Sequence, residues 1–462
     1  MSKQYDVIII GGGNAGFGVS AVAHAAGKSI AFVENWDFGG TCPNRGCTPK
    51  KFLVAAAQTL HEIERAEVHA IKVGAPKLDW AALIKREKSM VGFIPDAMAD
   101  LAMKRGDVYR GTARFTGPNT IDVDGLVLTG SNIVIATGSV PRPLPIPGAE
   151  YLATSDDVLS NENQPDEVVF IGGGVIAMEF SHVYARAGTK VTILEVAPRL
   201  LPQLDEDAVA ALQAESERLS ITVKTGVEVK EIVKIDGRLR VAYAIDGVDQ
   251  FVDADQVVNG AGRIANVDAL NLDAGNVKHD RLAIEVDGYL RSTSNPAVWV
   301  CGDALVGSAQ LSPIATYEGR IVGENIVSGP SVKPEYKAIP SGVYTVPALS
   351  TVGLTEKSAT EKGLNIKVTT SDMTGWFSGK TYAETVAYAK VIVDEDTDRI
   401  IGAHMVGHHS EDLIHHFAMA IRYGIPASDL KSDIFAFPTF SSDIKSMFWK
   451  GDKRMILGDV LK

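Results

Sequence analysis

Two copies of one local pattern constrain the fold of this chain more than any other feature of its sequence. In the first copy, an apolar strand over residues 5–10 runs into Gly11, Gly13 and Gly16, a helix of small residues follows, and a second strand ends at Glu34. In such a unit the first glycine permits a tight turn, the second lets a pyrophosphate approach the backbone, and the third allows close helix–strand packing. The carboxylate can bind a ribose hydroxyl. This copy predicts a parallel α/β unit that binds a dinucleotide.

The second copy repeats the same order of elements. Gly172, Gly174 and Ala177 follow another apolar strand, and Glu195 ends the next strand at the spacing seen in the first copy. A lone glycine fingerprint is a weak signal, but a fingerprint with its strand, helix and acidic residue is a specific one. The sequence therefore predicts an α/β protein with two nucleotide-binding units.

Between the two copies, Cys42 and Cys47 form a C-x4-C turn that leads into a helix predicted over residues 52–65. Two thiols in one tight turn at a helix start can close a small disulfide ring, and the helix N-terminus stabilises the thiolate once the pair is reduced. Taken alone, this spacing would fit two inert buried cysteines. The nucleotide fingerprint directly upstream instead favours a redox-active pair. The third cysteine, Cys301, lies on an apolar strand and is expected in the core.

Composition narrows the remaining classes of protein. The 462 residues are enough for two or three domains, and 45 Lys and Arg against 57 Asp and Glu give a net charge of −12. No basic run suggests binding to nucleic acid or to an anionic membrane. The chain enters a strand within five residues and has no long apolar run, so we expect neither a signal peptide nor a membrane span. Three cysteines without a disulfide framework indicate a cytoplasmic enzyme.

The fingerprints and the C-x4-C-x-P-K-K turn resemble the FAD-dependent pyridine nucleotide–disulfide oxidoreductases, the group of dihydrolipoamide dehydrogenase, glutathione reductase and mercuric reductase. The resemblance runs from about Tyr5 to about Met447. It implies two Rossmann-like nucleotide-binding domains, for FAD and NAD, an α+β C-terminal dimerisation domain, and hence a homodimer. The implied domains are residues 1–150 (FAD-binding, first part, with the dithiol), 151–286 (NAD(P)-binding), 287–337 (FAD-binding, second part) and 338–462 (dimerisation).

The resemblance also implies an electron path. Hydride would pass from the nicotinamide to FAD, two electrons would pass to a Cys42–Cys47 disulfide, and an external disulfide or small electrophile would accept them. Cys47 would be the flavin-side, charge-transfer thiol, and Cys42 the thiol that attacks the substrate. Lys50 would lie near flavin N5 with Glu179 as its carboxylate partner, since a buried ammonium needs such a pairing.

Several further residues match the cofactor motifs of the family. Asp303 would bind the ribitol chain, the A-T-G turn at 136–138 would run beside the flavin pyrophosphate, and the helix start at Ser312 would face the flavin O2 region. No metal site is predicted. The complete set expected to contact FAD is Gly11, Gly13, Asn14, Ala15, Gly16, Glu34, Gly40, Thr41, Lys50, Ala136, Thr137, Gly138, Gly302, Asp303 and Ser312. The set expected to contact NAD is Gly172, Gly174, Val175, Ile176, Glu179, Glu195 and Gly262.

The second nucleotide unit predicts NADH as the preferred electron donor, with NADPH as the alternative. Glu195 would accept hydrogen bonds from a ribose diol and would repel a 2′-phosphate. Arg199 is the one cation close to it in the sequence.

The chain departs from the family near its C-terminus. Family members have H-x-H-P-T-x-S-E there, and the second histidine, oriented by the glutamate, is an acid–base group supplied by the partner subunit. Here Phe437 takes the histidine position and Ser442 the glutamate position, in a frame fixed by Pro438, Thr439 and Ser441. Neither replacement can do His–Glu chemistry at neutral pH. General acid–base catalysis contributes ~10²–10⁴-fold, so ordinary disulfide turnover is expected to be slow.

Three functions remain open on these grounds. The chain could be a disulfide or small-electrophile reductase with an altered acid, although the histidines at 408, 409, 415 and 416 are expected to be ordinary packed or solvated residues. It could instead be an NAD(P)H diaphorase or quinone reductase without thiol turnover. It could also exclude protons, as does 2-ketopropyl coenzyme M oxidoreductase/carboxylase, which has phenylalanine at the same position. No cysteine follows Cys301, which argues against mercury and thioredoxin reduction, and no basic residue can be assigned to a glutathione pocket.

Overall fold

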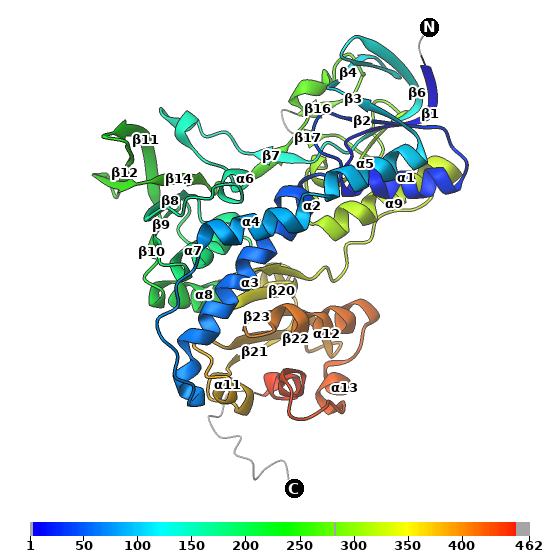
Figure 1. The fold of residues 1–462 in the computed structure, drawn as a ribbon. Coiled ribbons are helices and arrows are strands. Elements are labelled where there is room, and N and C mark those ends of the chain that lie inside the picture. Colours follow the sequence, from blue (N-terminus) through cyan, green and yellow to red (C-terminus); the bar gives the residue numbers. More distant parts are fainter. Residues whose placement is uncertain (1–2, 281–282, 450–462) are drawn as a thin grey trace.

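The computed structural model describes residues 3–280 and 283–449, which form three units joined by the long helix α3 (Cys47–Glu64). Figure 1 shows the first unit at the top right, the second at the left and the third below them. The last residues of the predicted dimerisation domain, 450–462, lie outside the described residues. Among the described residues, no helix has both the length and the apolar character needed to cross a membrane.

A seven-stranded sheet forms the first unit. Its strands are β1 (Lys3–Ile10), β2 (Ile30–Glu34), β3 (Asp107–Arg110), β4 (Ala113–Gly117), β5 (Thr120–Val123), β6 (Leu126–Ile135) and β18 (Val298–Val300). The order is β3-β2-β1-β6-β5-β4, with β18 also paired to β6, so the chain leaves this sheet and returns to it after the second unit. The parallel core of β1, β2 and β6 is buried, as expected for strands covered on both faces.

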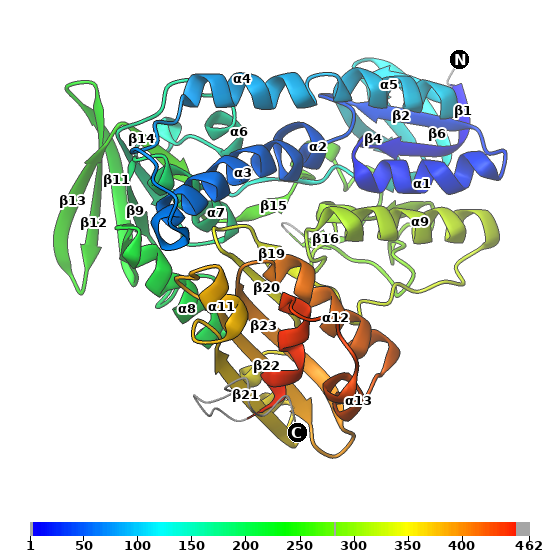
Figure 2. The same ribbon diagram turned by 60° about the horizontal axis from the view of Figure 1, so that its bottom comes forward.

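Helices α1 (Asn14–Ala25), α5 (Ile94–Arg105) and α9 (Ser312–Ser328) pack against the first unit. Figures 1 and 2 both show α1 and α9 side by side. Glycines make this close approach: a β-carbon on Gly18 would lie 2.5 Å from the Thr316 carbonyl oxygen, and one on Gly319 would lie 2.1 Å from that of Ala15. One glycine of each helix, outside the nucleotide fingerprint, therefore lets α1 and α9 pack closely.

The second unit is built around a parallel sheet in the order β10-β9-β8-β14. It contains β8 (Glu167–Ile171), β9 (Lys190–Leu194), β10 (Thr222–Lys224), β14 (Gln256–Asn259), the helices α6 (Ser155–Val158), α7 (Val175–Arg186) and α8 (Glu206–Arg218), and an antiparallel sheet of β11 (Val227–Ile235), β12 (Arg238–Ile245) and β13 (Val248–Ala254). The strands β7 (Ser139–Pro141) and β15 (Arg263–Ala265) pair where the chain enters and leaves this unit.

The third unit is an antiparallel sheet in the order β19-β20-β23-β22-β21, packed against α12 (Ser410–Tyr423). Its strands are β19 (Ser341–Val343), β20 (Ala348–Gly353), β21 (Ile366–Asp372), β22 (Tyr388–Asp394) and β23 (Arg399–Gly407). Shorter helices complete it: α10 (Glu356–Glu361), α11 (Phe377–Thr381), α13 (Ala427–Ser432) and the 3₁₀ segment η5 (Phe440–Phe448). Two nucleotide-type α/β units and a C-terminal α+β unit confirm the predicted fold class.

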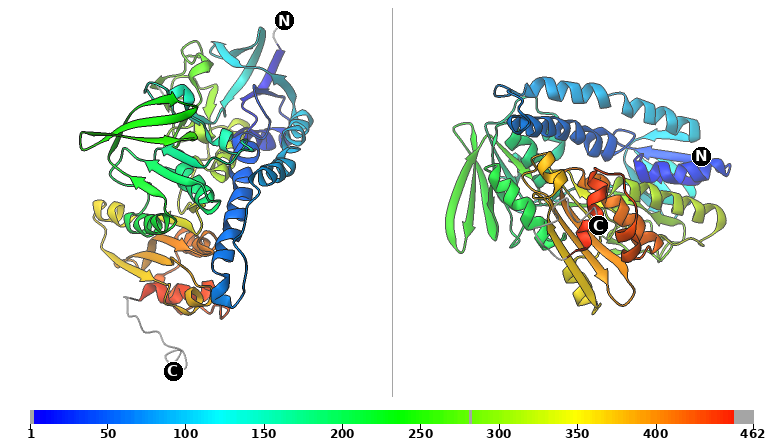
Figure 3. Two further views of the ribbon diagram at one scale, coloured as in Figure 1. Left: turned by 60° about the vertical axis from the view of Figure 1, so that its left-hand side comes forward. Right: turned by 90° about the horizontal axis from the view of Figure 1, so that it is seen from below.

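Helix α3 positions the dithiol turn relative to all three units. The short helix α2 (Thr41–Arg45) precedes it, and α4 (Trp80–Val91) packs along it. Figure 3 (left) shows α3 running from the first unit down to the third. The helix begins at Cys47 rather than near the predicted start at residue 52, because Pro49 lies in the first turn, where its missing N–H costs nothing. Both cysteines therefore belong to helix starts.

Candidate active site

The first nucleotide site is built at the turn from β1 to α1. Gly11 has a φ of +112°, and a β-carbon there would lie 2.2 Å from the Ala136 carbonyl oxygen. No side chain caps α1, so its first N–H groups remain free for an anion. The Glu34 carboxylate accepts hydrogen bonds from the backbone N–H groups of Gly12 and Trp36, each at 2.7 Å. These features hold the turn open at the place where a pyrophosphate would bind.

The other residues predicted to contact FAD gather around this turn. Gly40 and Thr41 lie at the start of α2, residues 136–138 follow β6, Gly302 and Asp303 follow β18, and Ser312 begins α9. The Thr137 hydroxyl is buried without a hydrogen-bond partner among the described residues. Asp303 accepts a hydrogen bond from the Ser139 hydroxyl at 2.8 Å through one oxygen. A buried hydroxyl awaiting a partner and an uncapped helix start are what a bound FAD would complete, so the residues present fit that cofactor.

The second nucleotide site repeats this geometry at the turn from β8 to α7. Gly172 has a φ of +100°, and a β-carbon there would lie 2.5 Å from the Gly260 carbonyl carbon. Gly174, Val175 and Ile176 form the uncapped start of α7, and Gly262 lies just before β15. Val175 is 45% exposed. The turn is open in the same way as the first, and it fits a second dinucleotide.

Two charged residues at this second site bear on the nicotinamide donor. The Glu195 carboxylate is buried after β9 and accepts hydrogen bonds from the N–H groups of Gly173 and Ala197. Arg199 donates to backbone carbonyls of its own loop, including those of Pro202 at 2.7 Å and Leu204 at 3.0 Å. Its guanidinium is therefore engaged in holding the loop.

The two thiols meet where α2 ends and α3 begins. Cys42 lies in α2, Cys47 is the first residue of α3, and both are free cysteines. A hydrogen bond from the Cys47 thiol, helped by the Ser312 hydroxyl and the charge of Lys50, lowers the pKa of Cys42 to about 6. The same thiol–thiol contact raises the pKa of Cys47, which is an exposed residue. Of the two thiols, Cys42, the one predicted to attack the substrate, is therefore the more acidic.

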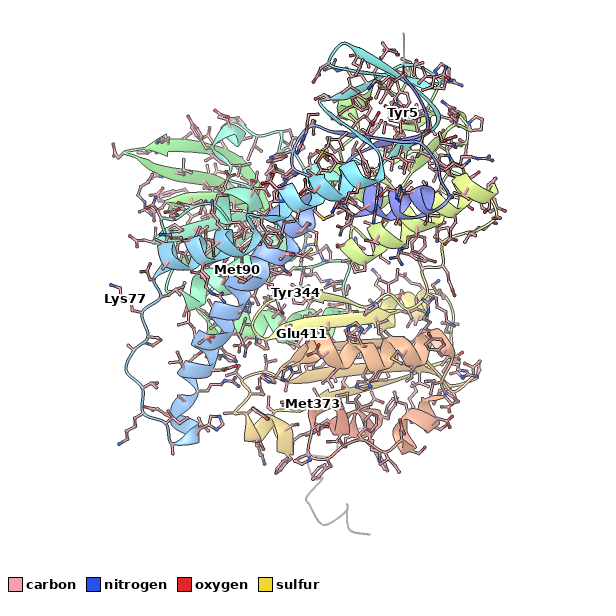
Figure 4. All side chains as sticks on the ribbon, turned by 45° about the vertical axis from the view of Figure 1, so that its right-hand side comes forward. Tyr5, Lys77, Met90, Tyr344, Met373 and Glu411 are labelled. Atoms are coloured by element: carbon pink, nitrogen blue, oxygen red, sulfur yellow. The ribbon has the colours of Figure 1, made fainter. Side chains whose placement is uncertain are left out.

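A buried ion pair lies one turn further along α3. The Lys50 ammonium is 2.6 Å from Glu179 Oε1 on α7, and both side chains are buried. The same oxygen accepts the backbone N–H of Tyr344 at 2.9 Å, and the Tyr344 ring lies 4.2 Å from the ammonium. Figure 4 labels Tyr344 and Glu411 where the third unit meets α3, and Lys51 reaches Glu411 at 3.6 Å. Residues from the second and third units therefore hold the start of α3.

Phe437 is not brought to this junction within the chain. It precedes η5 in the third unit, and the segment 435–448 (red in Figure 1) lies at the far end of that unit from α2. Its side chain is 67% exposed, with the Phe377 ring 6.2 Å away as its aromatic neighbour. Ser442 exchanges hydrogen bonds with Thr439 as part of a helix cap. Neither residue offers a titratable group.

Two titratable side chains of the third unit, Asp443 on η5 and His408 after β23, are partly buried. Asp443 accepts a hydrogen bond from the Ser378 hydroxyl, and burial raises its pKa to about 6. Burial lowers the pKa of His408 to about 4, and its ring stacks on Tyr382 at 5.4 Å. Among the described residues, no three His, Cys, Asp or Glu side chains gather as a metal site.

Three features of the site have no signal in the sequence. Arg45, inside the dithiol turn, lies 3.5 Å from the centroid of the Trp36 ring and 3.5 Å from Asp156 on α6. Tyr344 joins the third unit to the Lys50 pair. On the first unit, Arg105 and Arg320 line one groove. Each contact joins residues far apart in the chain, which local patterns cannot reveal.

Comparisons with known proteins agree with this geometry. The profile of the pyridine nucleotide-disulphide oxidoreductases matches residues 5–319, and that of the dimerisation domain of the same family matches residues 339–448. The chain is 32% identical to a dihydrolipoyl dehydrogenase of Chlorobaculum tepidum over 457 residues, covering 96% of each protein. It is 30% identical to a mercuric reductase of Staphylococcus aureus, covering 96% of this chain and 81% of that one.

A solved structure has the same fold along nearly its whole length. It is the HOCl-induced flavoprotein disulfide reductase RclA from Escherichia coli, with a TM-score of 0.85 and 28% identity, covering 96% of this chain and 99% of that one. RclA has also been solved as a Cu(II) complex, with a TM-score of 0.86.

Proposed function

Because the chain belongs to the pyridine nucleotide-disulphide oxidoreductase family, we propose that it passes two electrons from NAD(P)H through FAD to the Cys42–Cys47 pair and on to a disulfide or small electrophilic acceptor. Members of this family are FAD-dependent flavoproteins, so the chain is an FAD-dependent oxidoreductase. The observation that carries the proposal is the junction at the start of α3. It joins a thiol of low pKa, Cys42, to the buried Lys50–Glu179 pair beside the first nucleotide turn.

The chemistry at the thiols follows from this arrangement. FAD, held by the first set of residues, would supply the electron pair that opens the Cys42–Cys47 disulfide. The Cys42 thiolate then attacks one sulfur of the acceptor disulfide, forms a mixed disulfide and releases the other half as a thiolate, which takes up a proton. Cys47 gives up its proton and attacks the Cys42 sulfur, which releases the second half of the acceptor and restores the intramolecular disulfide. In total, the acceptor disulfide takes two electrons from the dithiol and two protons and becomes two thiols.

NADH is proposed as the preferred donor. A 2′-phosphate would meet the buried Glu195 carboxylate, and Arg199, the nearest cation in the sequence, is already bound to carbonyls of its own loop. A lower KM for NADPH than for NADH would overturn this assignment.

A homodimer is proposed on the match of residues 339–448 to the dimerisation domain of the family. In such a dimer the partner subunit's Phe437 would take the place of the family histidine at the acceptor side of the thiols. The exposure of Phe437 in the single chain agrees with a residue that is covered only on assembly. Its phenyl ring would exclude water there and would deliver no proton.

The missing acid supports a second candidate function, the reduction of acceptors that need no delivered proton. Phe437 and Ser442 do not titrate near neutral pH, and the carboxyl that follows Ser442, that of Asp443, is partly buried and accepts a hydrogen bond from Ser378. Quinones and metal ions belong to this class of acceptor, and the Cu(II) complexes of RclA make Cu(II) a suitable member to test. Proton-excluding carbon chemistry would also fit a phenylalanine at this position.

The test is NADH oxidation by the FAD-loaded dimer against lipoamide, glutathione disulfide, cystine, a quinone and Cu(II), with wild type and Cys42→Ser. Disulfide reduction should fall by roughly 10³-fold or more in Cys42→Ser, because the nucleophile is lost. Quinone reduction should persist in this variant, because it would draw electrons from the flavin. Disulfide turnover that survives in Cys42→Ser would contradict the proposed path, and quinone turnover that dominates in wild type would favour the second candidate.

A further inference from the structure

A carboxylate without a counter-ion lies inside the first unit. The Glu318 side chain, on α9, is completely buried. Among the described residues it forms no ion pair with a lysine, an arginine or a histidine. Burial raises the pKa of Glu318, because a charge is less stable away from water. Burying a charge without an opposite charge beside it is costly, so packing alone does not explain a glutamate at this position.

Three neutral hydrogen-bond donors hold the Glu318 carboxylate. Its Oε2 accepts the backbone N–H of Gly302 at 2.7 Å. Its Oε1 accepts the Ser308 hydroxyl at 3.0 Å and the Tyr336 hydroxyl at 2.8 Å. These bonds favour the charged form and oppose the effect of burial on the pKa. Glu318 thereby joins the turn after β18, the loop before α9 and the segment that leads to the third unit.

The turn that Glu318 holds belongs to the first nucleotide site. Gly302 has a φ of +71°, and a β-carbon there would lie 2.9 Å from the Ala15 β-carbon at the start of α1. Gly302, Asp303 and Ala15 are all in the set expected to contact FAD. The Asp303 charge also raises the pKa of Glu318, so the two carboxylates are close enough to repel each other. The Glu318 charge therefore lies directly behind residues of the FAD site.

We propose that Glu318 positions the Gly302–Asp303 turn for FAD and that its buried negative charge lowers the reduction potential of the bound flavin. Glu318 acts through the Gly302 N–H, so it is a positioning residue. Reduction places electrons on the flavin, and a fixed negative charge in a low-dielectric interior makes that step less favourable. A lower potential makes the reduced flavin a stronger electron donor. The inference goes beyond the proposed function, because it holds for any acceptor of these electrons.

A first experiment measures the flavin potential apart from the dithiol. The FAD-loaded protein carries Cys42→Ser and Cys47→Ser, and it is titrated anaerobically against a reference redox dye while the flavin absorbance is followed. Glu318→Gln keeps the size of the side chain and removes the charge. At a fixed potential it should raise the ratio of reduced to oxidised flavin by about tenfold, which is about 30 mV for a two-electron couple. Glu324→Gln is the matched control, because Glu324 is exposed on the same helix.

A second set of variants separates the charge of Glu318 from its hydrogen bonds. Glu318→Asp keeps the charge and shortens the side chain, and Tyr336→Phe removes one donor and leaves the carboxylate in place. Both should leave the flavin potential close to that of the parent protein. Both should raise the dissociation constant of FAD by about tenfold, as expected for one lost hydrogen bond to a charged group. Reconstitution of the apoprotein with FAD, followed by flavin fluorescence, measures this constant.

The results that would overturn the inference are specific to each part. A flavin potential in Glu318→Gln equal to that in Glu324→Gln would overturn the role of the charge. Equal shifts of the potential in Glu318→Gln and Glu318→Asp would do the same, because they would point to geometry. If Glu318→Gln does not fold, Tyr336→Phe still tests the positioning role, since Tyr336 is half-exposed, and an unchanged affinity for FAD would overturn it. These readouts need no acceptor, so failure of the proposed thiol path and failure of this inference are separate results.

Discussion

Next to the dithiol turn, Lys50 on α3 is held by an ion pair with Glu179 of the second unit, and Glu179 accepts a hydrogen bond from Tyr344 of the third unit. By contrast, Phe437 and Ser442 in the third unit carry no group that titrates near neutral pH. The first region holds the residues proposed to bring electrons to a disulfide. The second lacks the residues that would bring protons to the leaving thiolate. The contrast teaches that electron supply and proton supply are separate parts of this fold, and that one can change while the other is kept.

Removing the Glu179 carboxylate should destabilise the first region, and we expect this to be the largest of the predicted effects. In Glu179→Gln the Lys50 ammonium stays buried without its counter-charge, which typically costs about 3–5 kcal/mol of folding stability. Glu411→Gln is the matched control, since it removes the partner of the neighbouring Lys51, a more exposed pair worth less than about 1 kcal/mol. Urea unfolding measures both. Equal losses in the two variants would show that the buried pair has no special role.

Restoring the family's histidine and glutamate at positions 437 and 442 should give the second region a proton donor. Phe437→His with Ser442→Glu is expected to raise kcat for disulfide reduction by about 10²-fold, because general acid catalysis contributes ~10²–10⁴-fold. The gain should follow the protonated fraction of the new histidine and fade as the pH rises above about 7. Phe377→His places a histidine on the neighbouring aromatic residue as a control. No gain in the double variant would mean that another group already supplies the proton.

The buried carboxyl beside Ser442 should give the smallest effect. Burial raises the pKa of Asp443 to about 6, above its ordinary value, so the folded state binds this proton more tightly than the unfolded state does. Its contribution to stability is therefore present at low pH and is lost as the pH rises toward and through 6. Asp443→Asn should remove this loss. The difference in unfolding free energy between the variant and wild type should therefore be about 1–2 kcal/mol more favourable to the variant at pH 7.5 than at pH 4.5. Thermal unfolding at both pH values would show it, and an unchanged pH dependence would contradict it.

The first region was more predictable than the second because its signals are local. The glycine fingerprints placed α1, α7, Glu34 and Glu195, since the turn, the close backbone approach and the strand-end carboxylate all lie within a short stretch of chain. The start of α3 was predicted five residues late, at residue 52 rather than Cys47, because Pro49 reads as a helix breaker in sequence although the first turn tolerates it.

Long-range contacts account for what the sequence did not predict. Arg105 resembles an ordinary basic residue in the last turn of a helix, and Arg320 resembles an exposed helix residue, so nothing local unites them in one groove. Nothing local in the sequence joins Tyr344 to the Lys50–Glu179 pair that it contacts, or Asp156 to Arg45, with which it forms an ion pair. The departure at Phe437 was visible in sequence only because its frame of Pro438 and Thr439 was intact. Whether the chain has another proton donor depends on the dimer and on the acceptor, which local patterns do not encode.

The most direct test of the central claim is to ask whether NADH opens the Cys42–Cys47 disulfide. The oxidised, FAD-loaded protein is titrated anaerobically with NADH and quenched with iodoacetamide, and the alkylated cysteines are identified by mass spectrometry. Both cysteines should become alkylated in proportion to the added NADH. Cys301, which is buried directly after β18, should stay unmodified. A flavin that is fully reduced while Cys42 and Cys47 remain joined would contradict the account and assign the chain to the class of diaphorases.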